Sequence, residues 1–312
     1  MNLNQRAAAL CQRIVADVAR LRVEVSSIAG ATVIDAGIAA AGGLEAGLAL
    51  AEVCLAGLAN VALAPSSAAW HGPSVTVATD HPLAACMASQ YAGWQIAQGK
   101  FFAMGSGPMR AAAGKEAVFE RIGHREQPGQ AVGVLETRKL PPAEVIDYIA
   151  KACQVEAGQL TLLAAPTASQ AGGVQIVARS IETALHKMLE IGFDITRVAS
   201  GYGIAPLPPV AADDVAAIGR TNDAILYGGE VTLWCHGADA DLESFGPRIP
   251  SSASADHGQP FRQIFERYDR DFYRVDPHLF SPAVVNLVNL DSGRSFRFGK
   301  LLPDVVEQSF TT

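Results

Sequence analysis

The sequence predicts an α/β layered fold, large enough for two lobes or for one large unit. Short runs of β-branched and other apolar residues alternate with longer stretches of helical periodicity, which is the pattern of layered α/β proteins. The chain has 312 residues, of which 49% are hydrophobic and 18% are charged, so it can bury a core larger than one small domain needs.

The first part of the chain predicts helices and strands in alternation. Leu10, Ile14, Val18 and Leu21 follow at spacings of four, four and three residues, which make one stripe of a helix. Pro82 suits the start of a helix, because the first turn needs no amide proton. The further elements expected here are strands at 31–34, 61–64 and 75–79, and helices at 43–58 and 83–97.

The pattern repeats in the second part, with two irregular stretches. We expect strands at 131–136 and 160–165 around a helix at 142–153, then one long helix over 174–191 that ends before Gly192. Residues 200–209 are rich in Gly and Pro and predict an ordered loop or linker, and residues 245–260 predict a long surface loop. Residues 284–290 and 294–298 predict a β-hairpin around an Asp-Ser-Gly turn.

Charge and cysteine usage exclude several classes of protein. The net charge is -7, with 31 acidic and 24 basic residues and no basic run interleaved with aromatics, so nucleic acid is not an expected partner. Five scattered cysteines without a CxxC pair indicate reduced thiols in the cytoplasm. No secretory signal is evident at the N-terminus. The apolar region 28–64 is interrupted by Asp35, Glu45 and Glu52, so we expect no membrane span.

Common catalytic motifs are absent from the sequence. Residues 93–101 resemble a phosphate loop but are one residue too long and lack Ser or Thr after the lysine, and GxGxxG, GxSxG and HExxH do not occur. The seven histidines lack the short spacings of a metal-binding helix, and we expect structural roles for His81 and His236.

Three segments nevertheless concentrate polar residues in an apolar, Gly-rich setting. In the first, residues 100–110, Gly105 and Gly107 flank Ser106, and Pro108 can begin a helix with Arg110 in its first turn. Exposed amides at such a helix start would suit an anion or a polar headgroup. The alternative is a tight turn in which the glycines only supply positive φ.

The second segment contains Arg179 and Glu182, whose spacing of three puts both on one helix face. They could face a ligand together or form an ordinary surface ion pair. The third is the loop 201–209 followed by the polar cluster 219–223. It could line a ligand or brace a loop.

At these segments the sequence resembles methenyltetrahydromethanopterin cyclohydrolase. The matching stretches are TDHPLAACMASQYAGWQI (79–96), FFAMGSGPMRA (101–111), ARSIETALHKM (178–188), ASGYGIAPLPPV (199–210) and GRTNDAILYGGEV (219–231). They are spread over most of the chain, and the length fits as well.

The resemblance implies one cyclohydrolase unit over residues 1–312, an α/β to α+β fold of two interleaved lobes with a mixed sheet and an active-site cleft between them. It implies hydrolysis of a 5,10-methenyl pterin to its 5-formyl form, reversibly, with no cofactor and no metal. The expected partner is a tetrahydromethanopterin-type one-carbon carrier. The resemblance also implies a homotrimer.

The resemblance implies roles for individual residues too. Glu182 would be the general base and Arg179 would orient it, which agrees with their same-face spacing. Further substrate contacts are expected at Ser106, Gly105, Gly107, Arg110, Lys100, Asp80, Tyr202, Asn222 and Asp223.

Two other functions fit parts of the sequence. A pterin- or nucleotide-binding module without catalysis would use the Gly-rich loops alone and leave Arg179 and Glu182 as a surface pair. A hydrolase with Ser106 as nucleophile would need a neighbouring histidine base.

Overall fold

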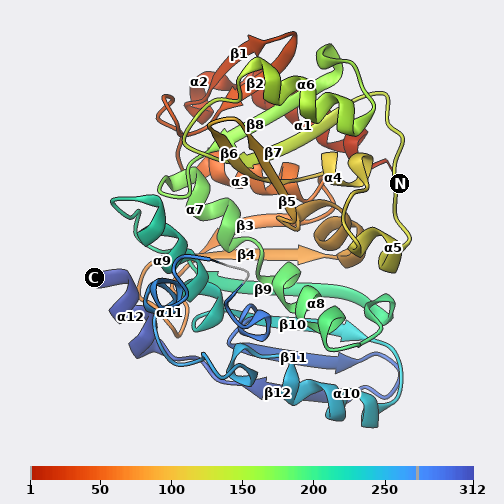
Figure 1. Ribbon diagram of the computed structural model, residues 1–312. Coiled ribbons are helices and arrows are strands. Elements are labelled where there is room, and N and C mark those ends of the chain that lie inside the picture. Colours follow the sequence, from red (N-terminus) through yellow and green to blue (C-terminus); the bar gives the residue numbers. More distant parts are fainter. Residues whose placement is uncertain (1, 272–273) are drawn as a thin grey trace. The chain divides into compact units, whose positions relative to one another are not determined.

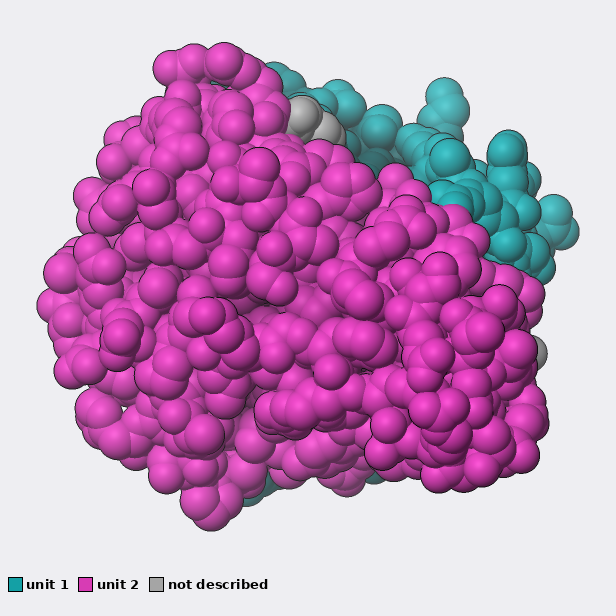
Figure 2. Space-filling model, turned by 90° about the horizontal axis from the view of Figure 1, so that it is seen from below, with its two compact units in different colours: residues 1–59, 84–175 teal, residues 60–83, 176–312 magenta. Residues whose placement is uncertain are grey.

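The computed structural model describes residues 2–271 and 274–312, and the chain forms two compact units. Unit 1 consists of residues 1–59 and 84–175, and unit 2 consists of residues 60–83 and 176–312. Figure 2 shows the two units in separate colours. Each unit is therefore assembled from two separate stretches of the chain, and each is built around one six-stranded sheet.

The sheet of unit 1, sheet A, is mixed. Its strands lie in the order β1 (Glu24–Ile28), β2 (Ala31–Asp35), β8 (Leu160–Ala165), β7 (Ala131–Glu136), β6 (Phe101–Ser106) and β5 (Trp94–Gln98). The three central strands β2, β8 and β7 run parallel, and the other pairings are antiparallel. The central strands are almost continuously apolar, as expected for parallel strands that are buried on both faces.

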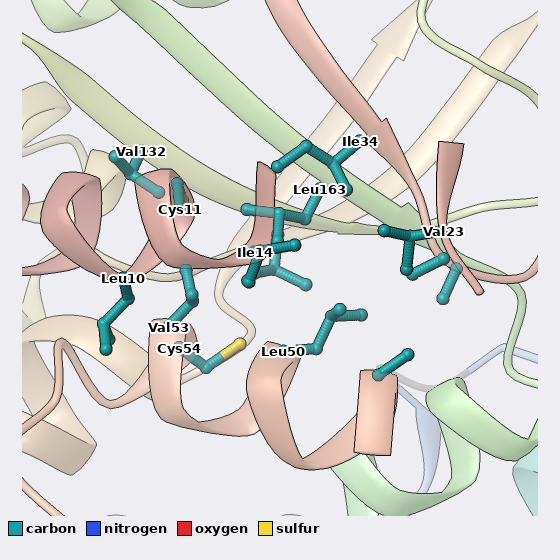
Figure 3. Packing of buried hydrophobic residues seen from close by; sticks show 14 of the residues in the cluster. Leu10, Cys11, Ile14, Val23, Ile34, Leu50, Val53, Cys54, Val132 and Leu163 are labelled. Carbon is teal, nitrogen blue, oxygen red and sulfur yellow. The ribbon is translucent and has the colours of Figure 1, made fainter. Parts of the chain in front are cut away.

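Helices cover both faces of sheet A. Leu162 and Leu163, neighbours on β8, join different core clusters, because successive side chains of a strand point to opposite faces. Figure 3 shows the cluster of Leu163, where α1 and α3 pack together. The helical segments that lie wholly or partly in this unit are α1 (Leu3–Ala16), α2 (Val18–Leu21), α3 (Leu44–Cys54), the π-helix η1 (Leu83–Gln90), α4 (Met109–Ala113), α5 (Val118–Ile122), α6 (Ala143–Cys153), η2 (Ala157–Gln159) and α7 (Gln170–Val177).

The sheet of unit 2, sheet B, has the order β12 (Ser295–Gly299), β11 (Val284–Asn289), β10 (Glu230–Cys235), β9 (Val198–Pro206), β4 (Ser74–Thr79) and β3 (Asn60–Ala64). Only β10 and β11 are parallel. Helix α8 (Ser180–Glu190) lies across β9 and β10 (Figure 1). The other helical segments are η3 (Ile195–Arg197), α9 (Asp214–Leu226), α10 (Asp239–Phe245), η4 (Gly246–Arg248), η5 (Ser251–Ala253), α11 (Phe261–Arg267), η7 (Pro277–Leu279) and α12 (Pro303–Thr311).

The two faces of sheet B differ in exposure. Val77, Val231 and Leu233 point to one face and are buried, whereas Tyr202 and Trp234 point to the other and keep part of their surface in solvent. Because side chains alternate along each strand, the register of β4, β9 and β10 extends this difference across the sheet. Sheet B therefore has one buried face and one partly open face.

The predicted mixed α/β fold is confirmed, and many elements agree with the sequence. The strands predicted at 31–34, 61–64, 75–79, 131–136 and 160–165 are β2, β3, β4, β7 and β8. The helices predicted at 43–58 and 142–153 are α3 and α6, and the predicted hairpin is β11–β12. Most of the predicted N-terminal stripe faces the core, since Leu10, Ile14 and Leu21 are buried.

Two predicted helices are wrong in extent. The helix predicted over 83–97 ends at Gln90, and Trp94–Gln98 is strand β5. Trp94 and Ile96 are buried while Gln95 and Ala97 are exposed, which is the alternation of a strand at the sheet edge. The long helix predicted over 174–191 is two helices, α7 and α8, because the chain leaves helical geometry at Ala178 and begins again with Arg179 as the N-cap.

Two stretches predicted as irregular contain ordered elements. The first, residues 200–209, overlaps strand β9 (198–206), which pairs with β4 on one side and β10 on the other. The predicted surface loop 245–260 contains the helical turns η4 and η5 and buries Ile249 and Ser251. In each case tertiary pairing or packing supplies the order that Gly, Pro and polar residues conceal locally.

Candidate active site

The N-terminal turn of α8 carries the two residues predicted to be catalytic. Arg179 is the N-cap, and its carbonyl accepts the first helical hydrogen bond from the Thr183 amide at 2.9 Å. Glu182 follows in the first turn, where the positive end of the helix dipole favours a carboxylate. Both residues are buried, Arg179 with 5% and Glu182 with 4% of its surface exposed. An acid and a guanidinium three residues apart are thus both buried at the start of α8.

Helix α8 is also fixed at its C-terminal end. The buried Lys187 ammonium donates to the His278 carbonyl at 2.5 Å, and Arg248 donates to the Ile191 carbonyl at 3.3 Å, just beyond the last turn. Burial lowers the pKa of Lys187 to about 8, although the charge of Asp276 acts in the opposite direction. These contacts limit sliding of the helix over sheet B, so the position of its first turn depends on how it rests on β9.

Ser106 lies in unit 1, at the end of strand β6. It is completely buried; its hydroxyl donates to the Val134 carbonyl at 3.3 Å and lies 3.4 Å from the Cys54 sulfur. Gly107 follows with φ of +86°, a conformation that favours glycine, and its amide donates to the Ser89 carbonyl at 2.9 Å. The predicted turn after Ser106 is therefore present, and Pro108 leads into α4 as expected.

Close packing around Gly105 explains why this position has no side chain. A side chain there would come within 2.8 Å of the Met109 methyl and 2.9 Å of Ile96. Lys100 is exposed at the β5–β6 turn, at the opposite end of β6 from Ser106. Six strand residues span about 20 Å, so the structure does not bring Lys100 and Ser106 together.

Arg110 is enclosed by its own unit. Its guanidinium donates to both carboxylate oxygens of Glu116, at 3.0 and 2.6 Å, and to the carbonyls of Met87 and Ser89, at 3.1 and 3.2 Å. It also lies over the ring of Tyr91, 4.9 Å from the ring centre. These contacts tie α4 to the end of η1 and to the segment that precedes α5.

Tyr202 and Asp80 lie away from the first turn of α8. Side chains built at Gly201 or Gly203 would meet α8, so Tyr202 between them points to the other face of sheet B, where it is 40% exposed. Asp80 is exposed and accepts a hydrogen bond of 2.8 Å from the hydroxyl of Ser200. Ser200 lies two residues before Tyr202 on β9, so both side chains point to the same face. Asp80 therefore lies at the partly open face of sheet B.

Asn222 and Asp223 lie on α9. The Asn222 amide donates to the Ile218 carbonyl at 2.8 Å, a contact within the helix. Asp223 has no exposed surface and accepts from the Phe261 amide at 2.8 Å, which fixes the start of α11. Burial raises the pKa of Asp223 to about 8, against the opposing effect of hydrogen bonds from Ser309 and Phe261.

Two histidines for which the sequence predicts structural roles make local contacts. The backbone amide of His81 donates to the Thr79 hydroxyl at 3.0 Å. The His236 ring lies with Nδ1 2.7 Å from the Asp291 carboxylate, at the turn of the β11–β12 hairpin.

Among residues 2–271 and 274–312, no three His, Cys, Asp or Glu side chains are grouped as a metal ion would require. Over the same ranges no helix is long and apolar enough to cross a membrane.

Sequence reasoning missed two residues next to the predicted catalytic pair, Ser180 and Gly203. They meet where α8 rests on β9. The available signal was the pair of glycines two residues apart, Gly201 and Gly203, which put two positions without side chains on one face of a strand.

Sequence comparison with known proteins finds a family match over nearly the whole chain. The profile of the cyclohydrolase (MCH) family matches residues 2–310. A protein from Rhodopirellula baltica is 50% identical over 290 residues, 91% of this chain and 87% of its own length. One from Methylobacterium sp. (strain 4-46) is 47% identical over 316 residues, 99% of this chain and 97% of its own.

A further relative, from Methanosarcina barkeri, is 46% identical over 241 residues, 76% of this chain and 75% of its own length. All three relatives bear the name methenyltetrahydromethanopterin cyclohydrolase. With a family match over nearly its whole length and relatives of this similarity, the chain belongs to the cyclohydrolase (MCH) family.

Proposed function

We propose that the protein hydrolyses 5,10-methenyltetrahydromethanopterin to 5-formyltetrahydromethanopterin, with Glu182 as general base and Arg179 as its partner. The observation that carries the proposal is the buried pair at the first turn of α8. Family membership and the names of relatives that match this chain along most of its length support the choice of substrate.

Hydrolysis of the methenyl bridge requires little more than a correctly positioned general base. The methenyl carbon bridges two nitrogens as a delocalised cation and is already electrophilic. Water attacks this carbon and forms a C–O bond while Glu182 accepts a proton; the adduct then breaks its bond to N10. One water proton ends on N10, and the other is released to solvent. General-base assistance of this kind contributes about 100- to 10,000-fold in rate.

Arg179 has two proposed roles. Its positive charge favours the ionised form of Glu182, and its N–H groups can donate to the oxygen of the tetrahedral adduct. Both roles require the guanidinium and the carboxylate to share a helix face at close range, which their spacing on α8 supports. Burial of both groups strengthens the electrostatic part, because the local dielectric constant is low.

We further propose that the protein works in the cytoplasm as a homotrimer, as the resemblance implies. Five buried cysteines suit a reducing compartment. Light scattering on a sizing column tests the assembly: a mass near three chains supports the trimer, and a mass of one chain contradicts it.

The function is tested by the loss of methenyl-pterin absorbance, in buffers where spontaneous hydrolysis is slow. Wild-type protein should accelerate the loss, and Glu182→Gln should lower kcat about 100-fold or more. Glu190→Gln, an exposed carboxylate in the last turn of the same helix, is the matched control and should keep its rate. Turnover that survives Glu182→Gln contradicts the mechanism, and tight binding without turnover by the wild type favours a binding module.

A further inference from the structure

We infer that Gly203 is a positioning residue for Glu182, acting through the close approach of β9 to Ser180 at the start of α8. The inference deepens the proposed function and rests on Glu182 being the general base. It assigns a role in the reaction to a residue that lies on a strand beneath the helix.

The contact between the strand and the helix start is unusually close. A Cβ atom built on Gly203 would lie 2.3 Å from the Ser180 hydroxyl oxygen, 3.2 Å from Ile181 Cγ1 and 3.3 Å from Ser180 Cβ. Gly201, the next residue on the same face of β9, would meet Ile181 Cγ2 at 3.0 Å. The two glycines therefore form a bare stretch of strand on which the first turn of α8 rests.

Backbone conformation does not explain Gly203. Its φ is not among the positive values in the chain, so another residue could adopt the same backbone geometry. Its central place in sheet B would favour a β-branched or aromatic side chain. What requires glycine is the space taken by Ser180 and Ile181.

A displacement at this contact would directly move the predicted base. Ser180 and Ile181 immediately precede Glu182 in the first helical turn, so a shift of either backbone shifts Glu182. Lys187 and Arg248 hold the far end of α8, so added bulk at residue 203 tilts the first turn away from the sheet. A misplacement of about 1 Å in a catalytic group can lower a rate roughly 100-fold.

The Ser180 hydroxyl oxygen causes most of the conflict, because it would lie 2.3 Å from the new Cβ atom. The contacts of 3.2 Å to Ile181 and 3.3 Å to Ser180 Cβ are also tight, but small shifts of these atoms accommodate them. Gly203→Ala should therefore fold, since its conflicts are with side-chain atoms, and should displace the turn modestly. Gly203→Val adds further atoms and should displace it more, in a residue type that suits a strand.

The test compares Gly203→Ala, Gly203→Val, Ser180→Ala and the double variant Ser180→Ala/Gly203→Ala. We expect Gly203→Ala to lower kcat about 10-fold and Gly203→Val about 100-fold, with KM changed less than about 3-fold. Ser180→Ala removes the nearest obstructing atom, so the double variant should recover most of the kcat lost in Gly203→Ala. A purely structural defect would lower the Tm and the apparent kcat together, so each kcat is compared with the Tm of the same variant.

Gly72→Ala is the matched control. Gly72 precedes β4 in the same unit, and a Cβ there would come 2.5 Å from Trp70 Nε1, a side-chain atom outside α8. Thermal unfolding of every variant shows whether a change in kcat merely follows a change in stability. The control should keep the wild-type kcat even if its Tm falls as much as that of Gly203→Ala.

The outcomes separate this inference from the proposed function. If wild type hydrolyses the substrate and Glu182→Gln is slow, but Gly203→Ala and Gly203→Val keep the wild-type kcat, only the inference fails. It also fails if Ser180→Ala gives no rescue, or if Gly72→Ala loses kcat equally. If wild type does not hydrolyse the substrate, or if Glu182→Gln is as fast as wild type, the proposed function fails and the inference fails with it.

Discussion

Arg110 and Glu116 form a two-pronged ion pair, with Nε to Oε1 at 3.0 Å and Nη2 to Oε2 at 2.6 Å. The Arg110 side chain is fully buried, whereas that of Glu116 is 17% exposed. Glu116→Ala would leave a buried cation without its carboxylate, which costs about 3 kcal/mol when the partner is partly exposed.

We therefore expect Glu116→Ala to lower the Tm clearly in a calorimetric scan. Glu120→Ala, which removes an exposed carboxylate from the neighbouring helix α5, is the control and should change the Tm little. Equal Tm values for the two variants would contradict a stabilising role for the Arg110–Glu116 pair.

The charge of Arg179 should be visible in the pH dependence of the reaction. Arg179→Gln removes a cation that favours the ionised carboxylate of Glu182, so the acid limb of the kcat/KM profile should move to higher pH. Arg179→Lys keeps the charge but loses the planar fork, so kcat should fall about 10-fold or more while the acid limb stays in place. A limb that stays unmoved in Arg179→Gln would show that Arg179 does not tune the base.

Asp223 should make the protein less stable as pH rises. Burial raises its pKa from 3.8 to about 8. Between these pH values ionisation of this group stabilises the unfolded chain but not the native chain. Its effect on stability is therefore a loss that grows from about pH 4 to about pH 8 and then levels off.

Asp223→Asn removes this ionisation and should keep an acceptor for the Phe261 amide. The Tm of the variant relative to wild type should rise by more than about 2 °C between pH 4.5 and pH 8. Asp304→Asn, at an exposed position on α12, provides the comparison and should show no such trend. A constant Tm difference across this range would mean that Asp223 ionises normally in the native protein.

The elements that the sequence predicted well are those with a complete local signal. Strands β2, β7 and β8 are short apolar runs because both of their faces are buried, and α6 combines a proline at its start with a clear apolar stripe. The β11–β12 hairpin has Gly293 at φ of +73° in its turn, which the Asp-Ser-Gly sequence favours.

The errors arose where distant segments determine the structure. Strand β9 contains Gly201, Gly203 and Pro206, which locally indicate a loop. It nevertheless pairs with β4 and β10. In the sequence, helix α9 separates β9 from β10, and several helices and strands separate it from β4. Its glycines are required by α8, a packing relation that no local pattern contains.

In the candidate site too, local patterns predicted some features, whereas others depend on tertiary packing. The spacing of Arg179 and Glu182 was enough to predict one helix face, and both lie in the first turn of α8. Spacing could not predict that Tyr202 would face the opposite side of sheet B, or that Asp223 would be buried beneath α11, since both depend on tertiary packing. Their contacts with substrate, like those of Ser106, stay predictions.

Ser106 allows a serine nucleophile to be distinguished from general-base hydrolysis. A nucleophilic serine gives its hydroxyl proton to a base, whereas the Ser106 hydroxyl donates its proton to the Val134 carbonyl at 3.3 Å. Ser106→Ala should therefore keep kcat within about 10-fold of wild type and lower stability by about 1 kcal/mol, through loss of the buried bond to Val134. Ser89→Ala, which removes another buried hydroxyl that donates to a carbonyl, controls for stability.

The two steady-state constants of Ser106→Ala then separate the remaining roles. A rise in KM of about 10-fold with kcat retained corresponds to one lost hydrogen bond to the substrate, as the resemblance implies. A loss of kcat of about 1,000-fold or more, with Ser89→Ala unaffected, would instead make Ser106 the nucleophile. In that case water attack assisted by Glu182 would no longer account for the reaction, because the first bond to the methenyl carbon would be made by the serine oxygen.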